Sequence, residues 1–171
     1  MAIIITLIAI LTVVALLNLL LTLGLIKRFR EVDQIVADLN AVEHEPMLPT
    51  GSAIDEFEAE TVDSETITHA SLTEGTIVGF FNPTCETCHG HIPTFSEVAA
   101  SLPDGRNQAL AVVQHNDDPD ELDEMVTPLS KAARVVVQPK RGTVWRAFGV
   151  QATPAFCQLG RDQLIAKHGY S

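Results

Sequence analysis

The sequence predicts an α/β domain behind one long apolar segment. From residue 53 onward, short runs rich in Val, Ile and Phe alternate with stretches of helical character, which is typical of a central sheet flanked by helices. A Cys-x-x-Cys pair, Cys85 and Cys88, stands where one of these runs turns into a helix. With 171 residues, the chain has room for one membrane segment and one compact domain.

The N-terminal apolar segment predicts a membrane anchor. Residues 1–26 carry no charged side chain, and Ile3–Ile26 is long enough to cross a bilayer as one helix. No basic stretch precedes the apolar core and no small-x-small cleavage site follows it, so we interpret this segment as a permanent single-pass anchor rather than a cleaved signal peptide. Lys27, Arg28 and Arg30 follow directly, and the positive-inside rule then places the domain in the cytoplasm.

Residues 27–52 are predicted to join the anchor to the domain. A helix is expected over Arg28–Glu45, because apolar side chains recur every three or four positions along it: Val32, Ile35, Leu39 and Val42. The stretch 45–52, which contains prolines and a glycine, then predicts a linker. The compact domain is therefore expected to span residues 53–171.

The domain opens with an acidic stretch that is β-prone in two patches, 57–59 and 66–68. The apolar runs and turn residues that follow predict strands and helices in alternation. In chain order these are a strand at 76–81, a helix from Cys88 to about Leu102, a strand at 108–113, a helix from Asp117, a strand at 134–137, a short helix at 142–148, and a hairpin of strands at 155–159 and 163–166. Pro128 is expected to end the second helix near Thr127, because proline removes a helical hydrogen bond.

The domain is strongly acidic. All 22 acidic residues follow Arg30, and only 8 of the 11 Lys and Arg residues lie there, which leaves a formal charge of −14. Such a charge argues against nucleic acid as a partner and against docking on anionic lipid. We interpret it as a solvated acidic surface.

The two cysteines of the Cys-x-x-Cys pair predict thiol–disulfide exchange. Cys85 falls at the start of a helix, where free backbone amides and the positive end of the helix dipole favour the thiolate that attacks disulfides. Cys88 lies one turn further on, within reach to close an intramolecular disulfide and to expel a trapped partner. Cys85 is therefore the predicted nucleophile and Cys88 the resolving cysteine, and their disulfide serves as the redox group without another cofactor.

Two further features resemble the thioredoxin superfamily. Pro93 stands five residues after Cys88, at the spacing of the proline that kinks the active-site helix of thioredoxin. Far downstream, Gly149-Val150-Gln151-Ala152-Thr153-Pro154 precedes a predicted strand, as in the cis-proline loop of that superfamily. The resemblance covers roughly Leu48–Lys167 and implies a thioredoxin-like fold. It also implies that Thr153 and a cis Pro154 face the dithiol and bind the extended chain of a substrate.

Within the superfamily, a Phe-Phe-x-Pro-x-Cys-x-x-Cys run after a membrane anchor is most similar to the tethered TlpA-, ResA- and MauD-like thiol–disulfide oxidoreductases. This resemblance implies a protein disulfide as substrate, an upstream electron donor and a domain outside the cytoplasm, where disulfides form. The side of the membrane is therefore left open, because Lys27, Arg28 and Arg30 indicate the cytoplasm. We favour the outside slightly.

Several positions depart from thioredoxin itself. Thr84 replaces the tryptophan before the first cysteine, and Gly79 stands at the position of the buried aspartate that assists the second cysteine. Glu86 resembles the Cys-Glu-x-Cys variant of ResA-like proteins, and its charge beside Cys85 opposes the thiolate and predicts a reductase rather than an oxidase. An equally good reading of Glu86 is an acid favoured by the helix dipole. Thr87, also between the cysteines, is grouped with the substrate-binding residues.

The resemblance leaves one part of the fold unaccounted for. The thioredoxin fold normally closes with a C-terminal helix, and the sequence leaves no room for one after the last predicted strand. The sheet face beside the active-site helix is then expected to be covered by the juxtamembrane segment or a partner, unless the fold is a shortened one.

Other readings of the same motif stay open. Cys85-Glu86-Thr87-Cys88-His89 also satisfies the C-x-x-C-H pattern of c-type haem attachment. His89 and His91 could complete a metal site, but both are expected to point to solvent from the helix. A third reading is a thioredoxin-fold binding or maturation factor for a partner enzyme, without redox activity. Cys157 and Trp145 are expected to be core residues.

Overall fold

A computed structural model describes residues 46–169 of the chain. The predicted anchor and the predicted juxtamembrane helix lie outside these residues. The described residues form one compact unit. Within the described part of the chain, no helix combines the length and the apolar character needed to cross a bilayer.

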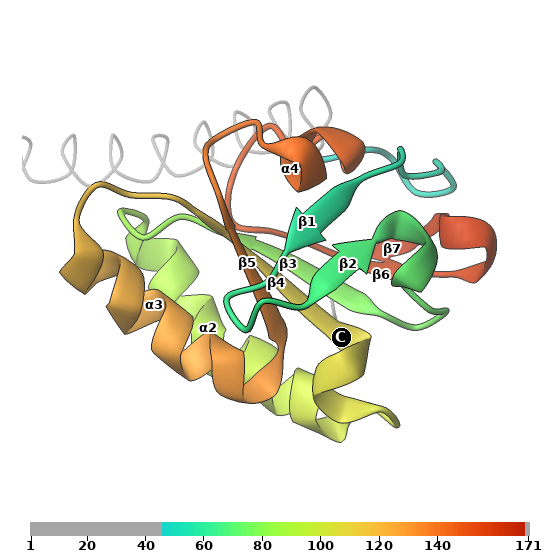
Figure 1. The fold of residues 1–171 in the computed structure, drawn as a ribbon. Helices are drawn as coiled ribbons and strands as arrows, with labels where there is room; N and C mark the ends of the chain where they lie inside the picture. The colour runs from blue at the N-terminus through green and yellow to red at the C-terminus, as the bar shows by residue number, and fades with distance from the viewer. Residues whose placement is uncertain (1–45, 170–171) are drawn as a thin grey trace, which may run out of the picture. The chain divides into compact units, whose positions relative to one another are not determined.

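The domain is built on a mixed five-stranded sheet with the order β5-β4-β3-β6-β7 (Figure 1). The three strands β3, β4 and β5 run parallel, and β6 and β7 run antiparallel to their neighbours. The strands are β3 (Ile77–Phe81), β4 (Ala109–Gln114), β5 (Arg134–Gln138), β6 (Ala155–Leu159) and β7 (Ile165–His168). Each matches a strand predicted from the sequence to within a few residues.

Helices cover the sheet on both faces. The two long helices α2 and α3 lie side by side on one face, and the short helix α4 and a hairpin of β1 and β2 cover the other (Figure 1). The bounds are β1 (Glu58–Glu60), β2 (Thr66–Thr68), α2 (Glu86–Ser101), α3 (Pro119–Ala132) and α4 (Thr143–Ala147), with short 3-10 turns at His69–Ser71, Gly105–Gln108 and Arg161–Gln163. The hairpin corresponds to the two β-prone patches of the acidic stretch.

Strand β3 is buried on both faces, which explains its uninterrupted apolar sequence. Ile77 and Phe81 face the core under α2 and α3, whereas Val78 and Phe80 face the core under α4. Each fully buried Phe side chain stabilises the fold by about 2–3 kcal/mol. The strand that leads into the Cys-x-x-Cys pair is therefore held firmly at the centre of the molecule.

Helix α3 continues through Pro128, so the predicted end near Thr127 is wrong. The helix extends to Ala132, and Leu129, directly after the proline, is fully buried. An interior proline costs about 3 kcal/mol, and burial of one Leu offsets about 2–3 kcal/mol of that cost. Arg106 adds to this, because its Nε donates to the carbonyls of Ser130 and Ala133 at 3.0 and 3.1 Å and so satisfies the end of the helix.

The stretch 46–52 is packed on the domain, whereas the sequence predicted a linker there. Met47 is only 3% exposed, and the Leu48 amide donates to the Phe148 carbonyl at 3.0 Å. Gly51 donates to Ile165, and Ile165 donates to Ser52, at 2.8 and 2.9 Å. These hydrogen bonds hold the stretch beside β7 and the end of α4.

The sheet face beside α2 carries one aromatic and one polar side chain on β6. The Phe156 ring packs on those of Phe81 and His91, with centroids 5.5 and 5.2 Å apart. Gln158 is half-buried, and its side chain donates to the Gly75 carbonyl at 3.2 Å. A polar side chain at this position reduces the apolar area that a further helix would have to cover. Among the described residues, β7 is the last element.

Replacing Pro128 with Ala is expected to stabilise the domain. The alanine restores the missing helical amide inside α3 without disturbing Leu129, so we expect the free energy of unfolding to rise by about 1–2 kcal/mol. Pro119→Ala is the matched control, because Pro119 stands in the first turn of the same helix, where proline costs nothing. Urea denaturation followed by circular dichroism measures both. A loss of stability in Pro128→Ala would show that the proline is required for the path of α3.

Candidate dithiol site

Cys85 is the N-cap residue of helix α2. Its backbone is extended, with φ −102° and ψ 107°, and the helix begins at Glu86. Its Sγ accepts a hydrogen bond from the Cys88 amide at 3.3 Å. The Cys85 sulfur therefore lies at the helix start, among amides that can hold negative charge developing on it. The side chain is half-exposed, so a substrate can reach the sulfur.

Cys88 lies one turn further along α2 and is fully buried. Burial raises the pKa of the Cys88 thiol from 9.0 to about 11, and its hydrogen bond with Cys85 acts in the same direction. Hydrogen bonds with the Asn82 backbone and the Thr153 side chain lower this pKa in part. At neutral pH, Cys88 is therefore a thiol. The pair therefore consists of one half-exposed sulfur and one buried sulfur.

The sheet brings the downstream Thr153-Pro154 pair to the cysteines. Strand β6 runs antiparallel to β3, so β6 begins at the edge of the sheet where β3 ends and α2 starts. The peptide bond between Thr153 and Pro154 is cis, as the resemblance implied. The sequence suggested a role for the Thr153 backbone, and the Thr153 side chain in addition lowers the pKa of the Cys88 thiol. Glu86 and Thr87 are exposed on the first turn of α2.

Gly79 lies in β3, where three aromatic rings leave no space for a side chain. A Cβ atom on Gly79 would lie 2.8 Å from the Phe81 ring, 3.0 Å from the Phe95 ring and 3.1 Å from the Phe156 ring. An acidic side chain at this position, as in thioredoxin, is incompatible with this packing. The surroundings of Cys88 on this side are apolar, in agreement with the burial that raises its pKa.

Asn82 shapes the turn that delivers Cys85 to the helix. Its Oδ1 accepts hydrogen bonds from the amide and the hydroxyl of Thr84, both at 3.1 Å, and its carbonyl accepts one from the Cys85 amide at 3.0 Å. This is the local pattern by which Asn forms turns. Asn82 is not among the predicted site residues, although an Asn-Pro pair after an apolar run is a recognisable turn signal.

His89 and His91 do not point freely to solvent, so that prediction is wrong. His89 is half-buried, and its Nε2 lies 2.7 Å from the Pro83 carbonyl. Because a carbonyl only accepts, Nε2 carries the proton and donates. In this tautomer the ring-nitrogen lone pair of His89 lies on Nδ1. His91 is half-buried and packs on Phe156.

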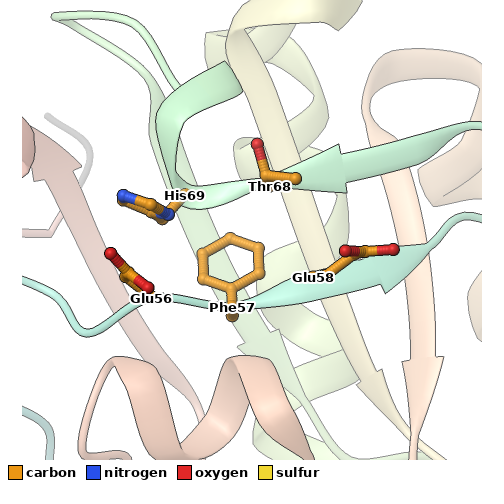
Figure 2. A pocket seen from close by; sticks show the side chains of 5 residues that line it. All are labelled: Glu56, Phe57, Glu58, Thr68 and His69. Atoms are coloured by element: carbon orange, nitrogen blue, oxygen red, sulfur yellow. The ribbon is translucent and has the colours of Figure 1, made fainter.

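Two open hollows lie away from the dithiol, and Phe57 lines both of them. The first has a volume of about 470 Å³ and is lined by Glu56, Phe57, Glu58, Thr68 and His69 (Figure 2). The second, also of about 470 Å³, is lined by residues of the same segment and of α4: Asp55, Glu56, Phe57, Glu58, Thr143, Arg146 and Ala147. Neither hollow is lined by Cys85, Cys88 or Thr153. The described residues also contain no cluster of three or more His, Cys, Asp or Glu placed to hold a metal ion.

Solved structures share this fold. The thioredoxin domain of a thiol–disulfide oxidoreductase from Bacteroides vulgatus superposes with a TM-score of 0.58 at 13% identity, covering 71% of this chain and 88% of that one. A secreted disulfide oxidoreductase of Mycobacterium tuberculosis, homologous to DsbE of E. coli, gives 0.54 at 21% identity, with 67% and 83% covered. The dsbF protein of MTB gives 0.51 at 25% identity, with 66% and 81% covered.

These similarities establish a thioredoxin-like fold, as predicted. The structural neighbours include thiol–disulfide oxidoreductases of the thioredoxin superfamily. No family model and no curated protein sequence matches the chain. The assignment to the TlpA-, ResA- and MauD-like group and the membrane anchor remain predictions.

The raised pKa of Cys88 predicts a pH-dependent reactivity. Only the thiolate is alkylated, so the rate of Cys88 modification should rise with pH through a midpoint near 11, while Cys85 is modified first. Peptide mass spectrometry after brief iodoacetamide pulses measures each cysteine separately. Thr153→Val should move the midpoint further up, because it removes a hydrogen bond that lowers the pKa.

Cys157 provides the control for unfolding in this experiment. Cys157 is buried in the core under α4, so the reagent reaches it only when the domain unfolds. Burial also raises the pKa of its thiol to about 12. The alkylation rates of Cys85 and Cys88 describe the folded domain as long as Cys157 stays unmodified. A Cys88 midpoint at or below 9.0, the ordinary value for cysteine, would contradict the buried environment described above.

Proposed function

We propose that this protein is a thiol–disulfide oxidoreductase that acts on disulfides of other proteins through Cys85 and Cys88. The observation that carries the proposal is the asymmetry of the pair. The half-exposed Cys85 sulfur accepts an amide hydrogen bond at the start of α2, and the buried Cys88 thiol stands one turn behind it. An accessible sulfur can form a mixed disulfide, and a neighbouring buried sulfur can resolve it.

The proposed reaction moves two electrons from the dithiol to the substrate. The Cys85 thiolate attacks one sulfur of the substrate disulfide; a Cys85–substrate disulfide forms, and the other substrate sulfur leaves as a thiolate and takes a proton from water. Cys88 then gives up its proton and attacks the Cys85 sulfur. The Cys85–Cys88 disulfide forms, the second substrate thiol is released, and an upstream dithiol donor restores the starting state by the reverse exchange.

The environment of Cys88 supports the reducing direction. Its pKa of about 11 means that the site does not stabilise the Cys88 thiolate, so the reduced form gains no stability from an anion at this position. A thiol of high pKa is a poor leaving group, which makes its disulfide harder to reduce. Glu86 beside Cys85 acts in the same direction, but it is exposed, and solvent weakens the effect of its charge.

The proposal includes a membrane tether of the TlpA-, ResA- and MauD-like kind. The apolar segment Ile3–Ile26 supports the tether, and the need to edit disulfides outside the cytoplasm supports an extracytoplasmic domain. A reporter fused to the C-terminus that is active on only one side of the membrane distinguishes this topology from the one that Lys27, Arg28 and Arg30 indicate.

A Cys88→Ser variant tests the exchange reaction. Without the resolving sulfur, the mixed disulfide through Cys85 should persist and appear as a reducible adduct on non-reducing gels, identified by mass spectrometry. The matched control is the Cys85→Ser, Cys88→Ser double variant, which should form none. Cys157→Ala should still release its substrates as the wild type does, because Cys157 lies in the other core.

The outcome also separates redox chemistry from a binding role. If function in cells survives Cys85→Ser and no adduct forms in Cys88→Ser, the domain is a binding or maturation module and the proposed reaction is wrong.

A further inference from the structure

The segment 46–48, called here the arm, lies against the loop that leads to the cis-proline. The Pro46 carbonyl accepts hydrogen bonds from the Gln151 amide at 2.8 Å and from the Ala152 amide at 3.5 Å. Gln151 and Ala152 directly precede Thr153. The Pro46 carbonyl, more than a hundred positions away in sequence, therefore accepts hydrogen bonds from both amides that directly precede Thr153.

The arm is itself firmly held. Met47 is 3% exposed and belongs to the same apolar core as Phe148 and Val150. Leu48 is fixed at both ends of its backbone, because its amide donates to the Phe148 carbonyl at 3.0 Å and its carbonyl accepts from His168 Nε2 at 2.9 Å. The fixed arm can therefore act as a rigid support for the loop.

Gly149 packs against the Leu48 side chain of the arm. A Cβ atom on Gly149 would lie 2.9 Å from Cγ and 3.0 Å from Cδ2 of Leu48, so the Leu48 side chain occupies the space that any other residue would need. The φ angle of Gly149 is +60°, which also favours glycine. The Leu48 side chain and the Gly149 turn thus fit together at the start of the loop.

We propose that the arm is a positioning element of the dithiol site, which holds the Gln151–Pro154 loop so that Thr153 reaches Cys88. The contacts run in series from buried Met47 through the Pro46 carbonyl to the two loop amides that directly precede Thr153. The importance of the arm for catalysis rests on the proposed exchange reaction.

Met47→Ala and Ile54→Ala form a matched pair for testing the arm in the full-length chain. Both side chains are buried in the same core, with 3% and 7% exposure. Ile54 lies beyond the arm, and its amide donates to Gln163 rather than to the loop. Both variants should therefore lower stability by comparable amounts, and only Met47→Ala should loosen the loop.

Two readouts report on the loop without requiring turnover. In Met47→Ala, amide hydrogen exchange of the peptide that contains Gln151 should accelerate about tenfold. The pH midpoint of Cys88 alkylation should rise by about half a unit, in the direction of Thr153→Val, because the hydrogen bond from Thr153 weakens. Ile54→Ala should leave both values as in the wild type.

Leu48→Ala keeps the test decisive if Met47→Ala does not fold. Leu48 is only half-buried, so its truncation is milder, and the same two shifts are expected at smaller size. Equal behaviour of the arm variants and Ile54→Ala in both readouts would overturn the positioning role. Failure of the Cys88→Ser trap with the arm shifts intact would instead overturn the exchange reaction and leave the arm in place.

Discussion

The other features of the site depend on the hydrogen bond that the Cys88 amide donates to the Cys85 sulfur, at 3.3 Å. It exists because the chain leaves β3 through the Asn82 turn and enters α2 at Glu86, which makes Cys85 the cap of the helix. The same geometry places the next cysteine one turn inside, where the helix faces the core. One turn of helix thus determines which sulfur is accessible to solvent and which is buried.

The sheet topology completes the site. Because β6 is antiparallel to β3, the loop before β6 arrives at the same edge of the sheet as the start of α2, and Thr153 comes within hydrogen-bonding reach of Cys88. The aromatic cluster of Phe81, Phe95 and Phe156 closes the space below and leaves room only for Gly79. Without an acidic group at that position, the Thr153 hydroxyl and the Asn82 backbone are the hydrogen-bond partners that lower the pKa of Cys88.

Local signals in the sequence were sufficient to predict the strands, the Cys-x-x-Cys turn and the hairpin at the end of the domain. The location of Thr153 and Pro154 opposite the cysteines was predicted from the resemblance, because no periodicity links segments so far apart. The end of α3 was mispredicted, since the cost of Pro128 is local while the burial of Leu129 that offsets it is tertiary.

The arm was missed for the same reason: Met47 is a single apolar residue among turn formers, and the partners of the arm at Phe148 and Gln151 are known only from the fold. The half-buried positions of His89 and His91 likewise depend on Pro83 and Phe156, which the helical pattern alone does not bring near.

The most direct measurement of the central claim is an equilibrium redox titration of the full-length protein against a dithiol–disulfide buffer, followed by the alkylation state of each cysteine. The account predicts a single two-electron transition confined to Cys85 and Cys88, at a potential near or below about −270 mV, the value typical of thioredoxin. Cys157 should stay a thiol throughout. A transition near about −120 mV, typical of a strong oxidant, would contradict the reducing role, and the lack of any Cys85–Cys88 transition would contradict the exchange chemistry altogether.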